Sequence, residues 1–238
     1  MTSHTVRAYD AEFAELDRIT AEMGGLAEMQ LANAVEALEK RDPELAEKAI
    51  ATDFRIDTLE SQLQERAVVM IAKRQPMAND LRHIMTVLTV VSGLERVGDL
   101  AKNIAKRARA IASETHPRPV MAGIGHLAEL AHGQLKDVLD AYSARDEEKA
   151  LVVWRSDAKL DALYNSVFRE LLSYMMEDPA NVGLCTHLLF AAKNLERIGD
   201  HATNIAEGVY YLVTGDPLSE ERPKGDDTST ILFNEPSD

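Results

Sequence analysis

The stretch LERVGDLAKNIA, residues 94–105, returns 101 residues later as LERIGDHATNIA, residues 195–206, with nine of its twelve positions identical. Self-similarity at so long a period indicates a duplicated structural unit. The chain has 238 residues and 45% hydrophobic content, enough to bury one large core or two of roughly 100 residues each, and the duplication favours two. Glycine and proline are sparse, at 12 and 8 residues, and charged residues alternate over short distances, which is typical of exposed helix faces. The sequence therefore predicts an all-α protein.

Helix boundaries follow from capping residues and prolines. Asp42-Pro43 and Asp178-Pro179 each pair an N-cap aspartate with a proline at the first helical position. Apolar residues recur between these points at spacings of three and four. We expect helices over residues 10–41, 43–73, 77–112, 120–145, 147–176 and 179–214. They form two tandem, pseudo-symmetric antiparallel three-helix bundles, over residues 1–112 and 120–215, with a linker at 113–119 and a disordered acidic tail at 216–238.

Each copy of the quoted stretch carries Glu-x-x-x-Asp, which places two carboxylates on one helix face. A second acidic pair repeats on the preceding helix at an offset of 104 residues. In an antiparallel helix pair, residues that lie level share a constant index sum, and the sums of 152 and 357 set Asp57 beside Glu95 and Asp53 beside Asp99, with the same arrangement in the second copy. The eight candidate ligands are Glu95, Asp99, Glu196, Asp200, Asp53, Asp57, Asp157 and Asp161.

Four carboxylates at close range require a shared cation or raised pKa values. Oxygen-rich sites without cysteine suit magnesium, manganese or iron. Asn103 and Asn204 extend the stripes and would add a carbonyl oxygen or orient a ligand. Surface ion pairing to Arg96 or Arg197 is the alternative to a metal. Gly98, and its counterpart in the second copy, either leaves room for a metal cluster or permits close helix packing.

Other classes of protein find little support. A formal net charge of −14 argues against nucleic acid as a partner. The sequence has no phosphate-binding glycine loop, no zinc-ligand spacing and no nucleophile elbow, so we expect no catalytic residues and no enzyme. Glu129-x-x-His132 and Asp80-x-x-His83 are unrelated by the repeat and are attributed to chance. Without an apolar span or a signal pattern, a cytoplasmic location is expected, and Cys185 is expected in the core.

With both LERxGD motifs in place, the chain resembles the PhoU family of phosphate-transport accessory and regulatory proteins. The likeness extends over residues 11–213 and includes AKRQP at 72–76 and YMMED at 174–178. It implies a negative regulator of the phosphate-starvation response, which links the ATPase subunit of a phosphate ABC transporter to a sensor histidine kinase. The resemblance also implies metal ligation by Glu95, Asp99, Glu196 and Asp200, with iron, zinc or magnesium as the ion, and a homodimer is expected.

Two alternatives stay open at this point. A carboxylate-bridged di-metal enzyme of the ferritin-like kind would need histidines on the acidic stripe, and none occurs there in both copies. A purely structural helical adaptor would use the acidic stripes only to contact basic partners. Any membrane association would be indirect, through the partner proteins.

Overall fold

The computed structural model describes residues 2–115, 117–220 and 222, and within them the chain forms six α-helices, one short 3-10 helix and no strand. The elements are α1 (Thr2–Lys40), α2 (Pro43–Arg74), α3 (Asn79–Ala110), α4 (Arg118–Ala144), α5 (Glu147–Glu177), η1 (Pro179–Asn181) and α6 (Val182–Thr214). The all-α prediction is confirmed.

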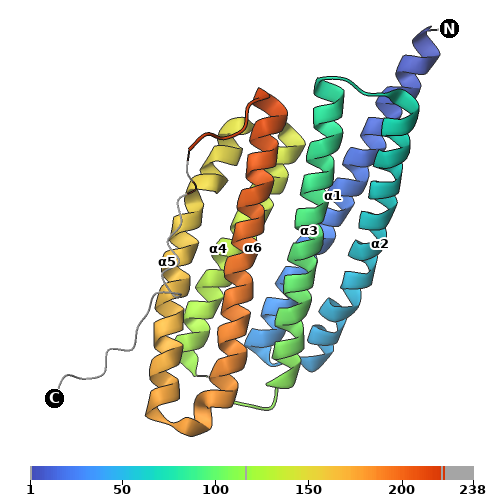
Figure 1. The fold of residues 1–238 in the computed structure, drawn as a ribbon. Coiled ribbons are helices and arrows are strands. Elements are labelled where there is room, and N and C mark those ends of the chain that lie inside the picture. The colour runs from blue at the N-terminus through green and yellow to red at the C-terminus, as the bar shows by residue number, and fades with distance from the viewer. Residues whose placement is uncertain (1, 116, 221, 223–238) are drawn as a thin grey trace.

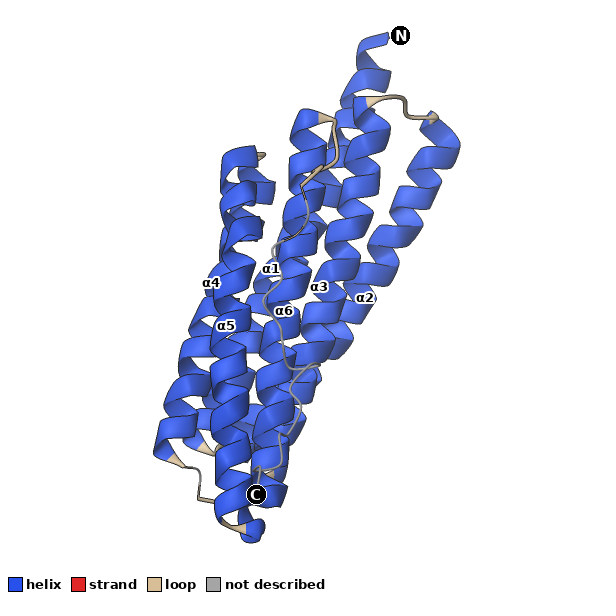
Figure 2. Ribbon diagram, turned by 60° about the vertical axis from the view of Figure 1, so that its left-hand side comes forward, coloured by secondary structure: helices blue, strands red, loops and turns tan. Residues whose placement is uncertain are grey.

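The helices form two three-helix bundles that stand side by side with their long axes nearly parallel (Figure 1). Helices α1 to α3 make the first bundle and α4 to α6 the second, and each helix runs antiparallel to the next. The bundles meet where α3 packs against α6 and α1 against α4. Seen from the side, the molecule is a bundle of long rods joined by short loops (Figure 2). Among the described helices, none has an apolar stretch long enough to cross a membrane.

Capping fixes the predicted helix starts. Asp42 Oδ1 accepts hydrogen bonds from the backbone N–H groups of Glu44 and Leu45, at 2.9 and 3.0 Å. Asp178 caps in the same way, but Pro179 opens the 3-10 turn η1, and the regular α-helix begins only at Val182. At the N-terminus, α1 begins at Thr2 rather than at residue 10, because no glycine or proline interrupts the chain before that position.

Small residues let the central helices approach closely. A Cβ atom added at Gly93 of α3 would lie 2.9 Å from Ile205 Cγ1 of α6, so the glycine sets the spacing between the bundles. Cys185 is fully buried in the core of the second bundle, as expected.

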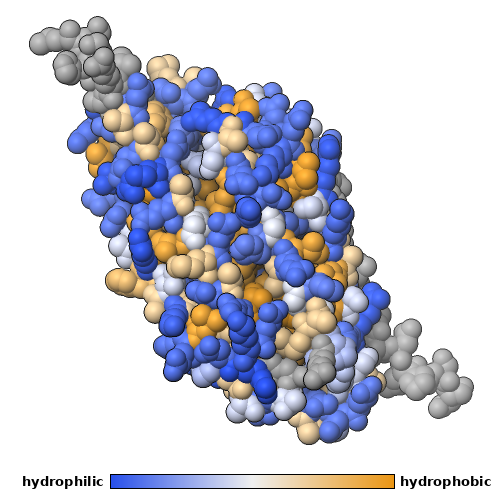
Figure 3. Space-filling model, turned by 180° about the vertical axis from the view of Figure 1, so that it is seen from behind, coloured by the Kyte–Doolittle hydropathy of each residue, from blue (hydrophilic) through white to orange (hydrophobic). Residues whose placement is uncertain are grey.

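The face of the molecule that is turned away from the viewer in Figure 1 is mainly hydrophilic, with hydrophobic residues scattered over it (Figure 3). Of the acidic tail assigned to residues 216–238, only 216–220 and 222 are described; the remainder lies outside the described residues.

Candidate acidic sites

The first acidic site lies between α2 and α3 and is built around Lys102. The Lys102 ammonium donates to Asp53 Oδ2 at 2.5 Å and to Asp99 Oδ1 at 2.6 Å, so it joins the two helices. Asp53 is buried, whereas Asp57, one turn further along α2, is exposed. Glu95, one turn before Asp99, pairs with the neighbouring Arg96 at 3.4 Å. The helix register predicted from the index sums thus brings Asp53 and Asp99 together.

Carboxylates outnumber cations in this site, and the pKa values of three of them, Asp57, Glu60 and Glu95, are raised. Although the Asp57 side chain is largely exposed, partial desolvation and then repulsion from Asp53 and Asp99 raise its pKa, and Lys102 opposes the rise. Burial likewise raises the pKa of Glu95. The positive charge of Arg96 lowers this pKa, and the negative charges of Asp99, Glu60 and Asp57 raise it further. Burial and the nearby charge of Asp57 raise the pKa of Glu60, a residue of α2 that the sequence analysis did not select. The site therefore holds more negative charge than Lys102 and Arg96 neutralise.

The second acidic site lies between α5 and α6, and its central cation comes from the C-terminal segment, residues 215–220 and 222. Arg222 Nε donates to Asp157 Oδ2 at 2.9 Å, and Nη2 donates to Asp200 Oδ1 at 2.5 Å. Its Nη1 reaches Asn204 Oδ1 at 3.3 Å. Arg222 therefore bridges the acids that correspond, through the repeat, to the pair joined by Lys102.

The two sites differ because the repeated motif differs. The position of Lys102 is occupied by Thr203 in the second copy, and the Thr203 hydroxyl donates to Asp157 Oδ1 at 3.2 Å. Glu196 is buried and pairs with Lys193 at 3.0 Å. Asp161 is also buried, at 3% exposure, so this site is more enclosed than the first.

Packing accounts for the mid-helix glycines. A Cβ atom at Gly98 would lie 3.1 Å from both Gln30 Oε1 and Ile56 Cδ1. At Gly199 it would lie 2.8 Å from Gln134 Oε1 and 2.2 Å from the side chain of a buried leucine of α5. Gln30 and Gln134, 104 residues apart, are buried equivalents on α1 and α4 that the sequence analysis missed. The glycines thus admit neighbouring side chains that lie against the α3 and α6 backbones.

The residues expected to support a ligand behave differently in the two copies. Both Asn103 and Asn204 are exposed, and Asn204 accepts a hydrogen bond from Arg222 of the C-terminal segment. Within the described residues, no group of three or more histidine, cysteine, aspartate or glutamate side chains is arranged to hold a metal ion. The ammonium of Lys102 and the guanidinium of Arg222 lie between the carboxylates instead. The structure thus shows ion pairs at these positions, and metal ligation there stays a prediction.

The histidine of the Asp80-x-x-His83 pattern lies in a different polar cluster. His83 Nε2 lies 2.9 Å from Asp17 Oδ1, and the Tyr142 hydroxyl donates to the same oxygen at 2.7 Å. The guanidinium of Arg145 approaches the other ring nitrogen of His83 at 3.4 Å. This cluster ties the two bundles together at one end, and it takes no part in either acidic site.

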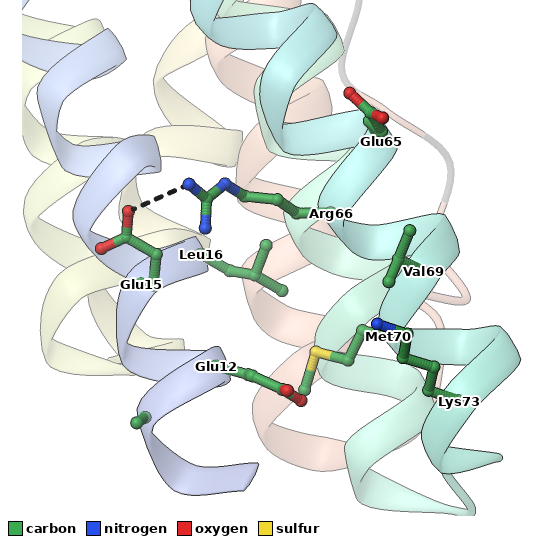
Figure 4. A pocket seen from close by; sticks show the side chains of 9 residues that line it. Glu12, Glu15, Leu16, Glu65, Arg66, Val69, Met70 and Lys73 are labelled. Atoms are coloured by element: carbon green, nitrogen blue, oxygen red, sulfur yellow. Dashed lines mark ion pairs between the residues drawn. The ribbon is translucent and has the colours of Figure 1, made fainter. Parts of the chain in front are cut away.

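A groove of about 530 Å³ runs between α1 and α2, and Figure 4 shows the side chains that line it. An ion pair of 3.8 Å between Arg66 and Glu15 crosses the groove, beside the apolar side chains of Leu16 and Met70. None of the eight candidate ligands lines it. The groove is therefore separate from both acidic sites.

A duplicated three-helix bundle with an acidic motif on the third helix of each copy defines a class of all-α proteins built from an internal repeat, and comparison with known proteins identifies the family. The PhoU domain model matches residues 20–108 and 124–209. The chain therefore belongs to the PhoU family.

Two curated relatives extend over almost the whole chain. A phosphate-specific transport system accessory protein PhoU homolog of Rhizobium meliloti is 55% identical, covering 96% of this chain and 97% of the relative. The corresponding homolog of Caulobacter vibrioides is 50% identical, covering 95% and 98%.

Solved structures give the same result. The crystal structure of PhoU from Pseudomonas aeruginosa superposes with a TM-score of 0.85 at 38% identity, covering 87% of this chain and all of that one. The phosphate transport system regulatory protein PhoU from Streptococcus pneumoniae gives a TM-score of 0.81 at 27% identity, covering 89% of this chain and all of that one.

Proposed function

We propose that this chain is an accessory protein of a phosphate-specific transport system and a negative regulator of the phosphate-starvation response. The observation that carries the proposal is the full-length 55% identity to a protein described as such an accessory protein. In this role the chain couples the ATPase subunit of the transporter to a sensor histidine kinase. It acts in the cytoplasm, as a homodimer, and reaches the membrane only through these partners.

The acidic sites suit recognition better than turnover. In each site a fixed cation bridges carboxylates of two long helices, which makes a rigid surface of defined charge. In the first site, Asp57 and Glu95 remain partly accessible, and excess negative charge there attracts a basic surface of a partner. A regulatory protein needs such a surface, and it needs no bound substrate.

Deletion of the gene tests the regulatory role. A strain without the chain should express phosphate-starvation genes in high phosphate, and the intact chain supplied in trans should restore repression. Normal repression in the deletion strain would refute the proposal. Pull-downs with the transporter ATPase and with the kinase test the two partners separately, and light scattering of the purified chain tests the homodimer.

A charge-matched comparison tests the acidic sites. Changing Glu95, Asp99, Glu196 and Asp200 together to their amides should relieve part of the repression and weaken capture of a partner. The control carries four exposed glutamates outside both sites, changed to glutamine; they are Glu44, Glu65, Glu148 and Glu177. If the control relieves repression as much as the site variant does, net charge alone explains the effect.

Metal binding at these sites stays a prediction of the sequence. The ion would be iron, zinc, magnesium or manganese, and it would have to displace Lys102 or Arg222 from the carboxylates that they bridge. Metal analysis of purified protein, with melting temperatures before and after chelation, tests it, because an ion that binds only the folded state stabilises that state. If the protein purifies without metal and its melting temperature does not change when metal ions are added, the result would favour ion pairing alone.

A further inference from the structure

We propose that the second acidic site is an arginine-binding site whose resident ligand is Arg222 of the chain's own C-terminal segment. The guanidinium contacts the site with all three of its nitrogen positions, at Asp157, Asp200 and Asn204. The planar fork of donors lets the guanidinium meet three acceptors, whereas the ammonium of Lys102 meets two in the first site. This inference rests on the side chains of this chain alone and is independent of the proposed regulatory role.

The two copies of the repeat show why an external cation is needed in one of them. In the first site, Lys102 belongs to the motif itself and neutralises Asp53 and Asp99. In the second site, the equivalent residue is Thr203, which is neutral. Without a cation, Asp157 would be a buried carboxylate with the Thr203 hydroxyl as its neutral partner, and its side chain is only 1% exposed. Burying a charge without a countercharge is strongly unfavourable, so Asp157 requires a cation from outside the repeated motif.

The C-terminal segment is placed to supply that cation. Gly215 ends α6 in the left-handed region, with φ of 89°, which turns the chain back. Leu218 then packs against the hydrophobic core and anchors the segment. From Thr214 to Asn204 the helix extends about 15 Å, and eight residues of extended chain reach up to about 26 Å, so residue 222 reaches the site without strain.

The contacts also bury Arg222. Its side chain is 15% exposed, which is low for an arginine. The segment thus closes the second site while the first site, which carries its own lysine, stays independent of it.

Hydrogen exchange of the full-length protein, followed by mass spectrometry, tests the resident ligand. In the unmodified chain, the backbone amides of residues 216, 218–220 and 222 should exchange more slowly than in an isolated peptide. Arg222→Ala should make them exchange at least about tenfold faster, because local opening no longer breaks charged hydrogen bonds. Equal protection in the two proteins, or exchange in the unmodified chain as fast as in an isolated peptide, would overturn the proposal.

A swap between the two copies gives the sharper test. Thr203→Lys places in the second site the residue that the first site uses, so the new ammonium should displace Arg222 and release the segment. The matched control Thr203→Val removes the hydroxyl without adding charge and should leave the segment protected. If Thr203→Lys folds and the segment keeps its protection, Arg222 does not compete for the lysine position and the proposal fails. If it does not fold, the comparison with Arg222→Ala decides.

Discussion

Gly199 offers a quantitative test of how closely the helices pack beside the second acidic site. An added Cβ atom would lie 2.2 Å from Leu160 Cδ2 and 2.8 Å from Gln134 Oε1. Leu160 is fully buried, so it has no empty space to move into, and α5 must shift away from α6. Gly199→Ala should therefore destabilise the protein, although alanine is the better helix former.

The expected size follows from two opposing effects. Replacing glycine by alanine in a helix interior gains about 1 kcal/mol. Overpacking a filled core costs about 1–3 kcal/mol, and a contact as short as 2.2 Å to a buried side chain belongs at the upper end. The net loss should be about 2 kcal/mol, which corresponds to a fall in melting temperature of about 4–8 °C for a chain of this size.

Matched glycines provide the controls in a calorimetric melting assay. Gly133 lies inside α4 with no neighbouring atom within 4 Å of an added Cβ, so Gly133→Ala should raise the melting temperature by about 2–4 °C. Gly98→Ala should fall between the two, because its nearest contacts are 3.1 Å away and end in a flexible methyl and amide. A Gly199→Ala protein that melts at or above Gly133→Ala would refute the packing account.

Three further changes test other features. Partial desolvation and nearby carboxylates raise the pKa of Asp57 above its ordinary 3.8, so the folded protein favours the protonated side chain. This contribution to the free energy of unfolding is fully present below pH 3.8 and is lost as the pH rises through the folded-state pKa. Asp57→Asn should therefore raise the melting temperature at pH 7 and change it little near pH 3.8. Tyr142→Phe removes a buried hydroxyl that donates to Asp17 and should cost about 1.5–3 kcal/mol in urea unfolding. Asp42→Ala removes the cap of α2 and should cost about 1 kcal/mol in the same assay.

The duplication made most of the architecture predictable. Two copies of one motif imply two equivalent units, and proline and aspartate mark where the helices begin. The index sums predicted that Asp53 lies level with Asp99, because an antiparallel helix pair with a known reversal point has only one register. Lys102 follows Asp99 by three residues in the quoted motif, so the spacing alone would have revealed the ion pair.

Other parts of the sites depend on contacts that no local pattern reports. Arg222 comes from a segment whose composition is typical of disorder, and its contact with Asp157 closes a loop of 65 residues. Glu60 has no acidic counterpart, because Tyr164 occupies the equivalent position, so the repeat gave no signal for it. The role of Gly98 was equally open, since the atoms that fill its space come from α1 and α2.

The contact between Arg222 and Asp157 of α5 extends the second bundle's functional unit beyond the end of α6, as far as residue 222. Helix α6 ends at Thr214, and the family match ends at residue 209, so a shortened chain would naturally be cut near residue 215. Such a cut would keep all six helices and the first acidic site, yet it would remove the central cation of the second. Measurements on a chain trimmed in this way would describe a protein with one intact site, and they would exaggerate the difference that the motif already sets between the two copies.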